Sequence, residues 1–282
     1  MKDEPEASIL LAGMIEFADI DSLDDPRLAL YRNLKDGELA AQGDRFIVEG
    51  HFVVQRVLVS DFPVDSVMIA RRKLEEMRAF LRPGVPVYLV PDSMVNKIVG
   101  FQFHTGVMAI ARRKPSITVE QLMGGCVGRC TLMVLPETSS LQNMGGLIRV
   151  AAAFGVSGVI VGPESVDPFY RLPIRVSMGT CFRLPILRSV DLRADLEQLQ
   201  ERWGVELVAT VLDADAQALQ SCRRGERLAL LFGGEGYGLG RQWVQICGRR
   251  ITIPMQLGTD SLNVTVSAAV FLYHFTSGAS AS

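Results

Sequence analysis

Residues 251–266 read Ile-Thr-Ile-Pro-Met-Gln-Leu-Gly-Thr-Asp-Ser-Leu-Asn-Val-Thr-Val. The β-branched start, 251–253, predicts a strand, and the apolar segment 262–275 predicts a helix. The polar residues between them have two interpretations: part of a ligand crevice, or the N-cap of an ordinary helix at Ser261 or Asp260. In the second interpretation the core positions of the helix are Leu262, Val266 and Ala269.

Two earlier segments also place glycine, asparagine or serine after a predicted strand. The strand 131–135 leads into Asn143-Met144-Gly145 and a helix predicted around 146–154, and the strand 228–232 leads into the glycine-rich run 233–240. In open parallel α/β sheets, ligands bind outside the carboxyl ends of the strands. Glycine also lets the backbone approach a ligand closely. The three segments therefore indicate where a ligand crevice would lie.

Each segment taken alone has an ordinary explanation. Asn143 could cap a helix on which Arg149 is solvated. These two residues are six apart, so they need not share a helical face unless the helix begins late. The run 233–240 could be taken for a dinucleotide fingerprint, but such a loop belongs in a first βα unit, with an acidic residue about 20 positions further on. A nicotinamide-dependent enzyme is therefore disfavoured.

The 282 residues contain two successive alternations of short β-branched runs and amphipathic stretches, which predict two α/β domains. We expect an acidic tail at 1–25, a first domain at 26–112, a linker at 113–117 and a second domain at 118–282. Apolar runs in the second domain indicate a mostly parallel sheet, buried on both faces. Expected elements of the first domain are helices at 27–39, 51–60, 71–81 and 92–98 and strands at 45–48, 67–69, 85–90 and 107–111. Further elements of the second are strands at 158–161, 184–187 and 206–210 and a helix at 192–203.

The formal net charge of −2 does not indicate a nucleic-acid binder, because phosphate binding normally needs a basic surface. We expect a local basic surface on the first domain, running from residues 71–73 to residues 112–114. Five cysteines without a CxxC pair and three scattered histidines argue against a disulfide framework and a zinc site, so we expect no metal. No apolar run near the N-terminus is long enough to span a bilayer, which predicts a cytoplasmic protein without a membrane partner.

Together, the order and spacing of the three segments resemble the motifs of the SpoU (TrmH) type methyltransferases of the SPOUT superfamily. The family usually has Asp-Pro shortly before the first asparagine, whereas this chain has Ser140-Leu141, a difference that could alter how the loop holds RNA. The matching strings are Asn143-x-Gly145 with Arg149, Gly233-Gly234-Glu235-Gly236-x-Gly238-Leu239, and Ile253-Pro254-Met255 with Ser261-Leu262-Asn263-Val264-x-Val266.

The resemblance implies a small L30e-like, RNA-binding N-terminal domain followed by an α/β trefoil-knot catalytic domain. It also implies a homodimer and the cofactor S-adenosyl-L-methionine. The catalytic residues it implies are Asn143, Arg149, Glu235 and Asn263. The cofactor-binding residues it implies are Thr210, Gly233, Gly234, Gly236, Ile253, Met255, Ser261 and Leu262.

The activity implied is methylation of a ribose 2′-hydroxyl in structured RNA, and the L30e-like domain favours 23S rRNA over tRNA. Arg149 is expected to clamp phosphate and a developing alkoxide, because its guanidinium stays protonated. Asn143 would orient Arg149 or the ribose, and Glu235 and Asn263 would fix the cofactor loop and the acceptor. The alternatives are a tRNA 2′-O-methyltransferase and a non-catalytic RNA-binding protein on the same fold.

Overall fold

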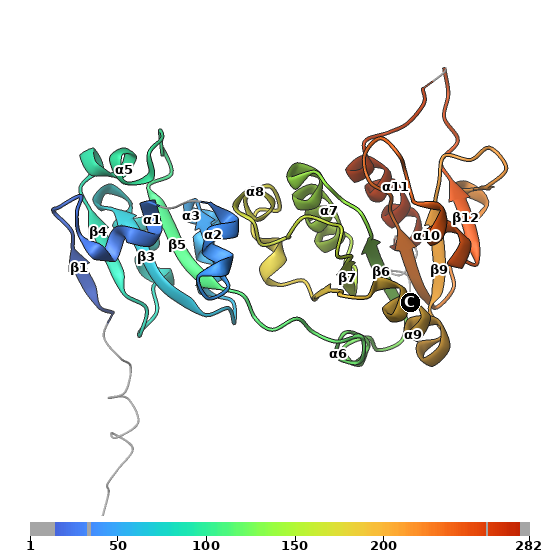
Figure 1. The fold of residues 1–282 in the computed structure, drawn as a ribbon, viewed down its shortest axis with the longest axis horizontal. Helices are drawn as coiled ribbons and strands as arrows, with labels where there is room; N and C mark the ends of the chain where they lie inside the picture. The colour runs from blue at the N-terminus through green and yellow to red at the C-terminus, as the bar shows by residue number, and fades with distance from the viewer. Residues whose placement is uncertain (1–14, 33–34, 258, 277–282) are drawn as a thin grey trace, which may run out of the picture. The chain divides into compact units, whose positions relative to one another are not determined.

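The computed structural model describes residues 15–32, 35–257 and 259–276 (Figure 1). The chain divides into two compact units between Lys114 and Pro115. This division falls inside the segment that the sequence predicts as a linker. Each unit is an α/β structure built around one sheet, as expected.

The first unit has a five-stranded sheet with a parallel half and an antiparallel half. In sheet order the strands are β1 Phe17–Asp19, β4 Val87–Val90, β3 Val64–Ala70, β5 Val107–Arg112 and β2 Arg45–Glu49. The first three are mutually parallel, and β5 runs antiparallel to both of its neighbours. The helices are η1 Pro26–Leu28, α1 Ala29–Arg32, α2 Asp36–Ala41, α3 His51–Leu58, η2 Arg71–Lys73, α4 Leu74–Met77, η3 Arg78–Phe80 and α5 Asp92–Val99.

The start of this unit differs from the predicted acidic tail at 1–25. Residues 17–19 form strand β1, which pairs with β4, and Ile20 is fully buried. A three-residue edge strand among acidic residues gives no periodic signal, which is why the sequence did not predict it. Residues 1–14 lie outside the described part of the chain. The helix expected over 27–39 is likewise broken into η1, α1 and α2.

The expected continuous basic surface on this unit is wrong. Residues 71–73 follow the carboxyl end of β3, whereas Arg112 ends β5, and these two strands are antiparallel, so the two triplets lie at opposite ends of the sheet. Carboxylates also pair with most of these cations, which reduces the local positive potential. The ion pairs are Arg71 with Asp19 and Asp21, Arg72 with Asp92, Lys73 with Glu76, Arg112 with Asp65, and Lys114 with Asp61.

The second unit contains a seven-stranded sheet in which every pairing is parallel. In sheet order the strands are β10 Gln217–Ala218, β12 Arg249–Thr252, β9 Glu206–Thr210, β11 Arg227–Leu231, β6 Cys130–Leu135, β7 Gly158–Val161 and β8 Ile186–Arg188. The helices are α6 Val119–Gly124, α7 Leu141–Ala153, α8 Arg171–Val176, η4 Thr180–Phe182, α9 Leu192–Trp203, η5 Leu219–Ser221, α10 Arg241–Ile246 and α11 Val264–Thr276. The sequence predicted the parallel sheet but not α6, α8, α10 or β10.

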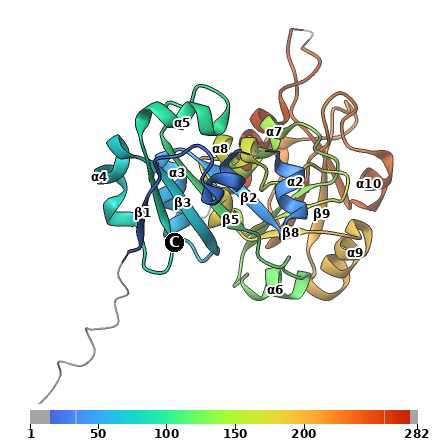
Figure 2. The ribbon, with the colours of Figure 1, turned by 60° about the vertical axis from the view of Figure 1, so that its left-hand side comes forward.

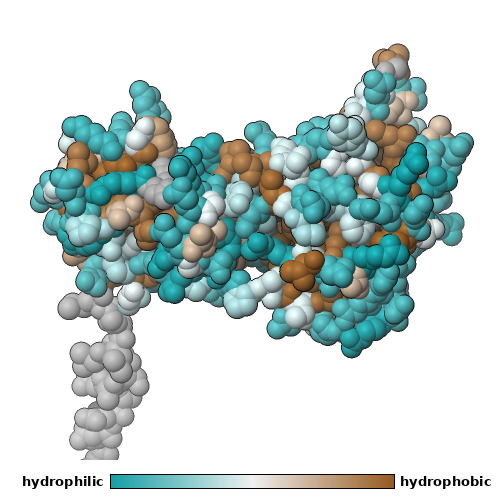
Figure 3. Space-filling model, viewed as in Figure 1, coloured by the Kyte–Doolittle hydropathy of each residue, from teal (hydrophilic) through white to brown (hydrophobic). Residues whose placement is uncertain are grey.

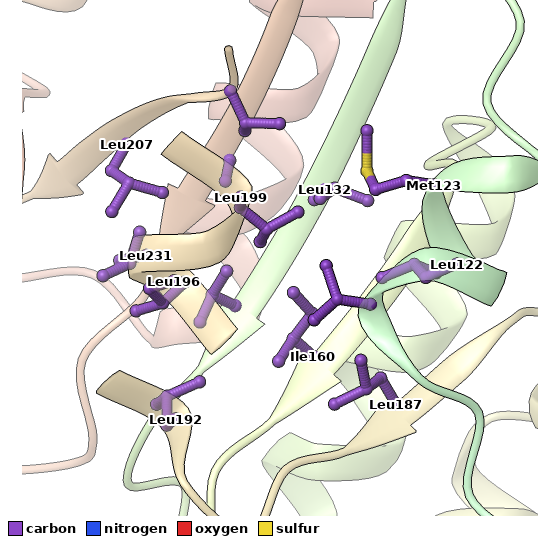
Figure 4. Close-up of a cluster of buried hydrophobic side chains, with 14 of the residues drawn as sticks. Leu122, Met123, Leu132, Ile160, Leu187, Leu192, Leu196, Leu199, Leu207 and Leu231 are labelled. Carbon is purple, nitrogen blue, oxygen red and sulfur yellow. The ribbon is translucent and has the colours of Figure 1, made fainter. Parts of the chain in front are cut away.

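Helices cover both faces of this sheet, α6 and α9 on one side and α7 and α11 on the other (Figures 1 and 2). Successive side chains of a strand point to opposite faces, so each central strand contributes to two cores. Leu132 of β6, Leu231 of β11 and Leu207 of β9 meet Leu196 and Leu199 of α9 in the core drawn in Figure 4. Because all strands are parallel, their carboxyl ends lie along one edge, where the three glycine- and asparagine-containing segments begin.

We expect Leu132→Ala to lower the free energy of unfolding of this unit by about 2–5 kcal/mol, since a fully buried leucine leaves a cavity when truncated. Urea denaturation of the full chain measures the change. Val127→Ala is the matched control, because Val127 is 93% exposed, and its effect should stay within about 0.5 kcal/mol. Equal stability of the two variants would contradict the packing in Figure 4.

Candidate active site

A pocket of about 550 Å³ lies at the carboxyl ends of β9, β11 and β12. Its size is in the range of sites that hold a drug-sized or cofactor-sized molecule. Apolar side chains form much of its wall, and two of them, Phe232 and Phe271, meet edge to face with ring centroids 5.8 Å apart. The pocket therefore combines a hydrophobic lining with the backbone groups of the loops that close it. The other apolar lining residues include Ile253, Met255 and Leu262.

The turn after β11 is built from glycine because the backbone crosses itself closely. A Cβ on Gly233 would lie only 2.1 Å from the carbonyl carbon of Gly238, and one on Gly234 would lie 2.4 Å from the carbonyl oxygen of Glu137. Gly234 and Gly238 also form an isolated antiparallel bridge. The turn is thus a tight, backbone-defined wall of the pocket, which no larger residue could form at Gly233 without displacement.

Three segments that are distant in sequence are joined at this pocket by one chain of hydrogen bonds. Asn143 Nδ2 donates to Glu235 Oε1 at 2.5 Å, and Asn263 Nδ2 donates to Asn143 Oδ1 at 3.0 Å. The backbone N–H of Thr265 then donates to Asn263 Oδ1 at 2.9 Å. A carboxylate only accepts, so it forces Asn143 to present its amino group and fixes the direction of every later bond. Glu235 therefore orients both asparagine amides.

Glu235 remains a carboxylate at neutral pH. Partial burial raises its pKa, but hydrogen bonds from the Asn143 side chain, from its own backbone and from Ser139 outweigh this effect and hold the pKa below its ordinary value. Ser139 Oγ donates to the second carboxylate oxygen at 3.1 Å. A carboxylate with a lowered pKa is a weak base, so its geometry fits an orienting role better than proton abstraction.

The helix caps at the site differ from the predictions. Helix α7 begins at Leu141, five residues before the expected start, and its cap is Ser140, whose Oγ accepts from the N–H of Asn143 at 3.2 Å. Asn143 lies in the first turn, where its side chain is available to Glu235. Ser140 thus performs the capping role that aspartate can also perform.

At α11 the Thr265 N–H bonds to Asn263, not to Ser261 or Asp260. Asn263 therefore contributes both to the helix start and to the polar chain. The core positions that the N-cap interpretation gave for this helix are also wrong. Leu262 is 36% and Val266 48% exposed, and Ala269 is only partly buried. The side chains that α11 buries are Ala268, Phe271, Leu272 and Phe275.

With one exception, the residues predicted for the site line this single pocket. They are Asn143, Thr210, Gly233, Gly234, Glu235, Gly236, Ile253, Met255, Ser261, Leu262 and Asn263. The exception is Arg149, which is exposed on α7 and is not part of the pocket lining. Six residues along a helix correspond to about 9 Å and a turn of about 600°, which separates Arg149 from Asn143.

One wall of the pocket and one of its supports were not predicted from the sequence. The wall is the segment 211–213 after β9, where Asp213 is held by Arg250 at 2.7 Å. The support is Glu137, whose Oε1 accepts from the indole N–H of Trp243 at 2.9 Å and thereby ties α10 to the loop after β6. Asp213 could have been predicted, because a carboxylate shortly after a predicted strand is a local signal in the sequence. The contact of Glu137 with Trp243 could not, because more than a hundred residues separate the two.

Two other classes of site are absent from the described residues. No cluster of three or more histidine, cysteine, aspartate or glutamate side chains there could hold a metal ion. Nor does the described part of the chain contain a helix of the length and apolarity that a bilayer span requires. The five cysteines are free thiols, and burial raises the pKa of Cys181 and of Cys247 to about 12.

The second unit has the architecture of SPOUT-type methyltransferase domains. Its sheet is all parallel, and a glycine turn and the C-terminal helix enclose one pocket at the edge of that sheet. The chain belongs to the SpoU rRNA methylase family, whose model matches residues 131–273. It is 35% identical over 270 residues to an uncharacterized tRNA/rRNA methyltransferase of Mycobacterium tuberculosis, covering 93% of this chain and 92% of that protein.

Two further similarities extend over most of the chain. The 23S rRNA (guanosine-2′-O-)-methyltransferase RlmB of Ralstonia nicotianae is 27% identical over 235 residues, which cover 81% of this chain and 94% of that one. A crystal structure of an RNA 2′-O ribose methyltransferase matches with a TM-score of 0.73 and 26% identity, covering 91% of this chain and 97% of that chain.

Proposed function

We propose that this protein transfers the methyl group of S-adenosyl-L-methionine to a ribose 2′-hydroxyl of 23S rRNA. The observation that carries the proposal is the chain of hydrogen bonds from Glu235 through Asn143 to Asn263, because it joins all three family motifs at one pocket. The names of the RlmB relative, a 23S rRNA (guanosine-2′-O-)-methyltransferase, and of the similar RNA 2′-O ribose methyltransferase structure support the same reaction.

The pocket fits the proposed cofactor in size and in chemistry. Its apolar walls suit an adenine ring and the methylene groups beside the sulfonium, while the backbone of the glycine turn and the Ser261 hydroxyl offer hydrogen bonds. Thr210 lines the pocket but donates its hydroxyl to the carbonyl of Leu231 at 2.8 Å, so it shapes the wall between β9 and β11. When bound, S-adenosyl-L-methionine supplies an electrophilic methyl group on a sulfonium.

In such a reaction the protein positions the methyl donor and the ribose acceptor and stabilises the charge that develops on the acceptor oxygen. Holding two reactants in line contributes about 7–11 kcal/mol in well-oriented cases. Asn143 and Asn263, oriented by Glu235, lie where they would fix the acceptor ribose at the pocket. Arg149 would hold the adjacent phosphate and the oxygen that becomes negative, since its guanidinium donates several N–H groups and keeps its charge.

Arg149 requires a second subunit for this role, because it does not line the pocket of its own chain. We infer a homodimer in which Arg149 reaches the pocket of the other copy. An apolar stripe supports this, since residues at helical spacing on α11 remain exposed to solvent in the single chain, and apolar side chains also reach the surface of this unit in Figure 3. The stripe consists of Val266, Val270 and Tyr273.

Mixed dimers test this arrangement. We expect an Arg149→Ala dimer to be inactive because it lacks the arginine. We expect a Gly233→Ala dimer to be inactive because its cofactor pocket does not form. If the arginine acts across the interface, their heterodimer regains one complete site, and methylation should return well above either variant alone. No recovery in verified heterodimers would mean that Arg149 acts within its own chain or not at all.

The substrate is tested by mapping 2′-O-methyl positions in cells with and without the gene. Loss of one mark in 23S rRNA is the expected result. Loss of a mark in tRNA alone would overturn the rRNA proposal, and no lost mark despite bound S-adenosyl-L-methionine would favour a non-catalytic RNA-binding protein.

Three further parts of the proposal concern fold and location. The first unit would act as the L30e-like RNA-binding domain. The return of the chain from β12 past the glycine turn to α11, which packs on α7, would form the trefoil knot of the family. An rRNA substrate would place the protein in the cytoplasm.

A further inference from the structure

The glycine turn after β11 carries an aromatic side chain that neither the core nor the hydrogen-bond chain uses. Tyr237 is 100% exposed, yet it belongs to the lining of the pocket. Tyrosine offers a large planar surface, which most proteins bury at least in part. Its place at the rim therefore points to a binding partner and not to a role in folding.

The backbone that presents Tyr237 is held on several sides. The bridge between Gly234 and Gly238 closes the turn, and the Gly233 backbone lies directly against that of Gly238. Within the turn, Glu235 is anchored to Asn143 and to Ser139. The tyrosine thus projects from a preorganised turn, which reduces the entropy lost when a partner binds.

The flanks of Tyr237 are open, and an exposed cation follows it closely in the sequence. Its neighbours Gly236 and Gly238 have no atom within 4 Å of where a Cβ would lie, so both flanks of the turn can admit a flat group. Four residues further on, Arg241 is exposed and has no carboxylate partner among residues 15–32, 35–257 and 259–276. An exposed aromatic ring followed by a free guanidinium is the combination that binds unstacked RNA bases and their phosphates.

We propose that Tyr237 stacks on a base of the RNA substrate next to the target ribose, with Arg241 neutralising a nearby phosphate. This inference rests on the proposed function and adds a residue that selects an unpaired, splayed-out target. A lid over the cofactor and a contact with the second subunit are the competing roles for Tyr237. The open flanks and the exposed cation four residues further along the chain favour RNA.

The test compares Tyr237→Ala and Tyr237→Phe in methylation of an unmodified 23S rRNA transcript. The alanine variant should raise the KM for RNA by about 5- to 150-fold, as one lost base–aromatic stack predicts. Its dissociation constant for S-adenosyl-L-methionine, from calorimetry, should stay within about twofold of wild type. The phenylalanine variant keeps the ring and should behave almost as wild type. Val190→Ala, a 94% exposed position in the same unit, is the control for general surface effects.

Each other outcome overturns this role. Weaker cofactor binding with an unchanged KM for RNA would make Tyr237 a lid, and a shift from dimer to monomer in sedimentation would make it an interface residue. A Tyr237→Phe variant as defective as the alanine variant would show that the hydroxyl matters and not stacking. Failure of the wild-type protein to methylate the transcript would instead count against the proposed function, so the two failures are distinguishable.

Discussion

Arg149→Ala is expected to lower turnover by a factor of about one hundred or more while S-adenosyl-L-methionine binds as tightly as to wild type. The activity falls because one fixed cation near a developing negative charge is removed. Cofactor binding persists because Arg149 does not line the pocket of its own chain and, in the proposed dimer, holds the RNA phosphate and acceptor oxygen and not the cofactor. Single-turnover methylation of 23S rRNA and calorimetric titration of the cofactor separate the two effects.

Two further variants sharpen this result. Arg193→Ala removes another exposed arginine of the same unit, one that pairs with Glu197 on the surface, and should leave turnover unchanged. Arg149→Lys keeps the charge but loses the planar fork that can hold two oxygens, so we expect it to be severely impaired. An Arg149→Ala protein with near-normal turnover, or with a defect only in cofactor binding, would contradict the proposed role.

The local pattern was sufficient to predict which segments meet at the pocket. Gly233, Ser261 and Asn143 each follow a predicted parallel strand, and the carboxyl ends of parallel strands share an edge, so their proximity follows from topology alone. The pairing of Asn143 with Glu235 did not follow, because it depends on where α7 begins. A start at Leu141 instead of residue 146 turns the asparagine from a cap into a side chain that faces the glycine turn.

The predictions were less accurate for the surroundings of charged residues than for the buried apolar strands. The buried runs of the central strands are visible as continuous stretches of sequence, whereas the partners of a basic residue come from distant segments. Arg72 pairs with Asp92 and Lys114 with Asp61, which neutralises cations that had suggested an RNA surface. The helical repeat was sufficient to predict that Arg149 and Asn143 lie apart. The proposed contribution of Arg149 to the pocket of a second copy could not be predicted in this way, because the sequence pattern of one chain does not encode how two copies assemble.

Gly233→Ala should abolish the cofactor pocket without unfolding the protein. The added Cβ would lie 2.1, 2.2 and 2.4 Å from backbone atoms of Gly238 and Leu239, so the turn must move, and this turn forms a wall of the pocket. We expect the dissociation constant for S-adenosyl-L-methionine to rise by about a hundredfold or more, which corresponds to about 3 kcal/mol. Residues 228–231 of β11, which lead into the turn, are fully buried and are not touched by the added Cβ, so far-UV circular dichroism should remain that of wild type.

Gly248→Ala is the matched control, because it makes the same substitution in the same unit where a Cβ meets nothing within 4 Å and the backbone φ is not positive. It should bind the cofactor normally and change stability by less than about 1 kcal/mol. Leu262→Arg, which places a charge on another lining residue of the same pocket, should reproduce the binding defect of Gly233→Ala. Normal cofactor binding by Gly233→Ala would show that the turn adapts to a side chain. The loop that contains Leu262, and not the glycine turn, would then have to hold the ligand.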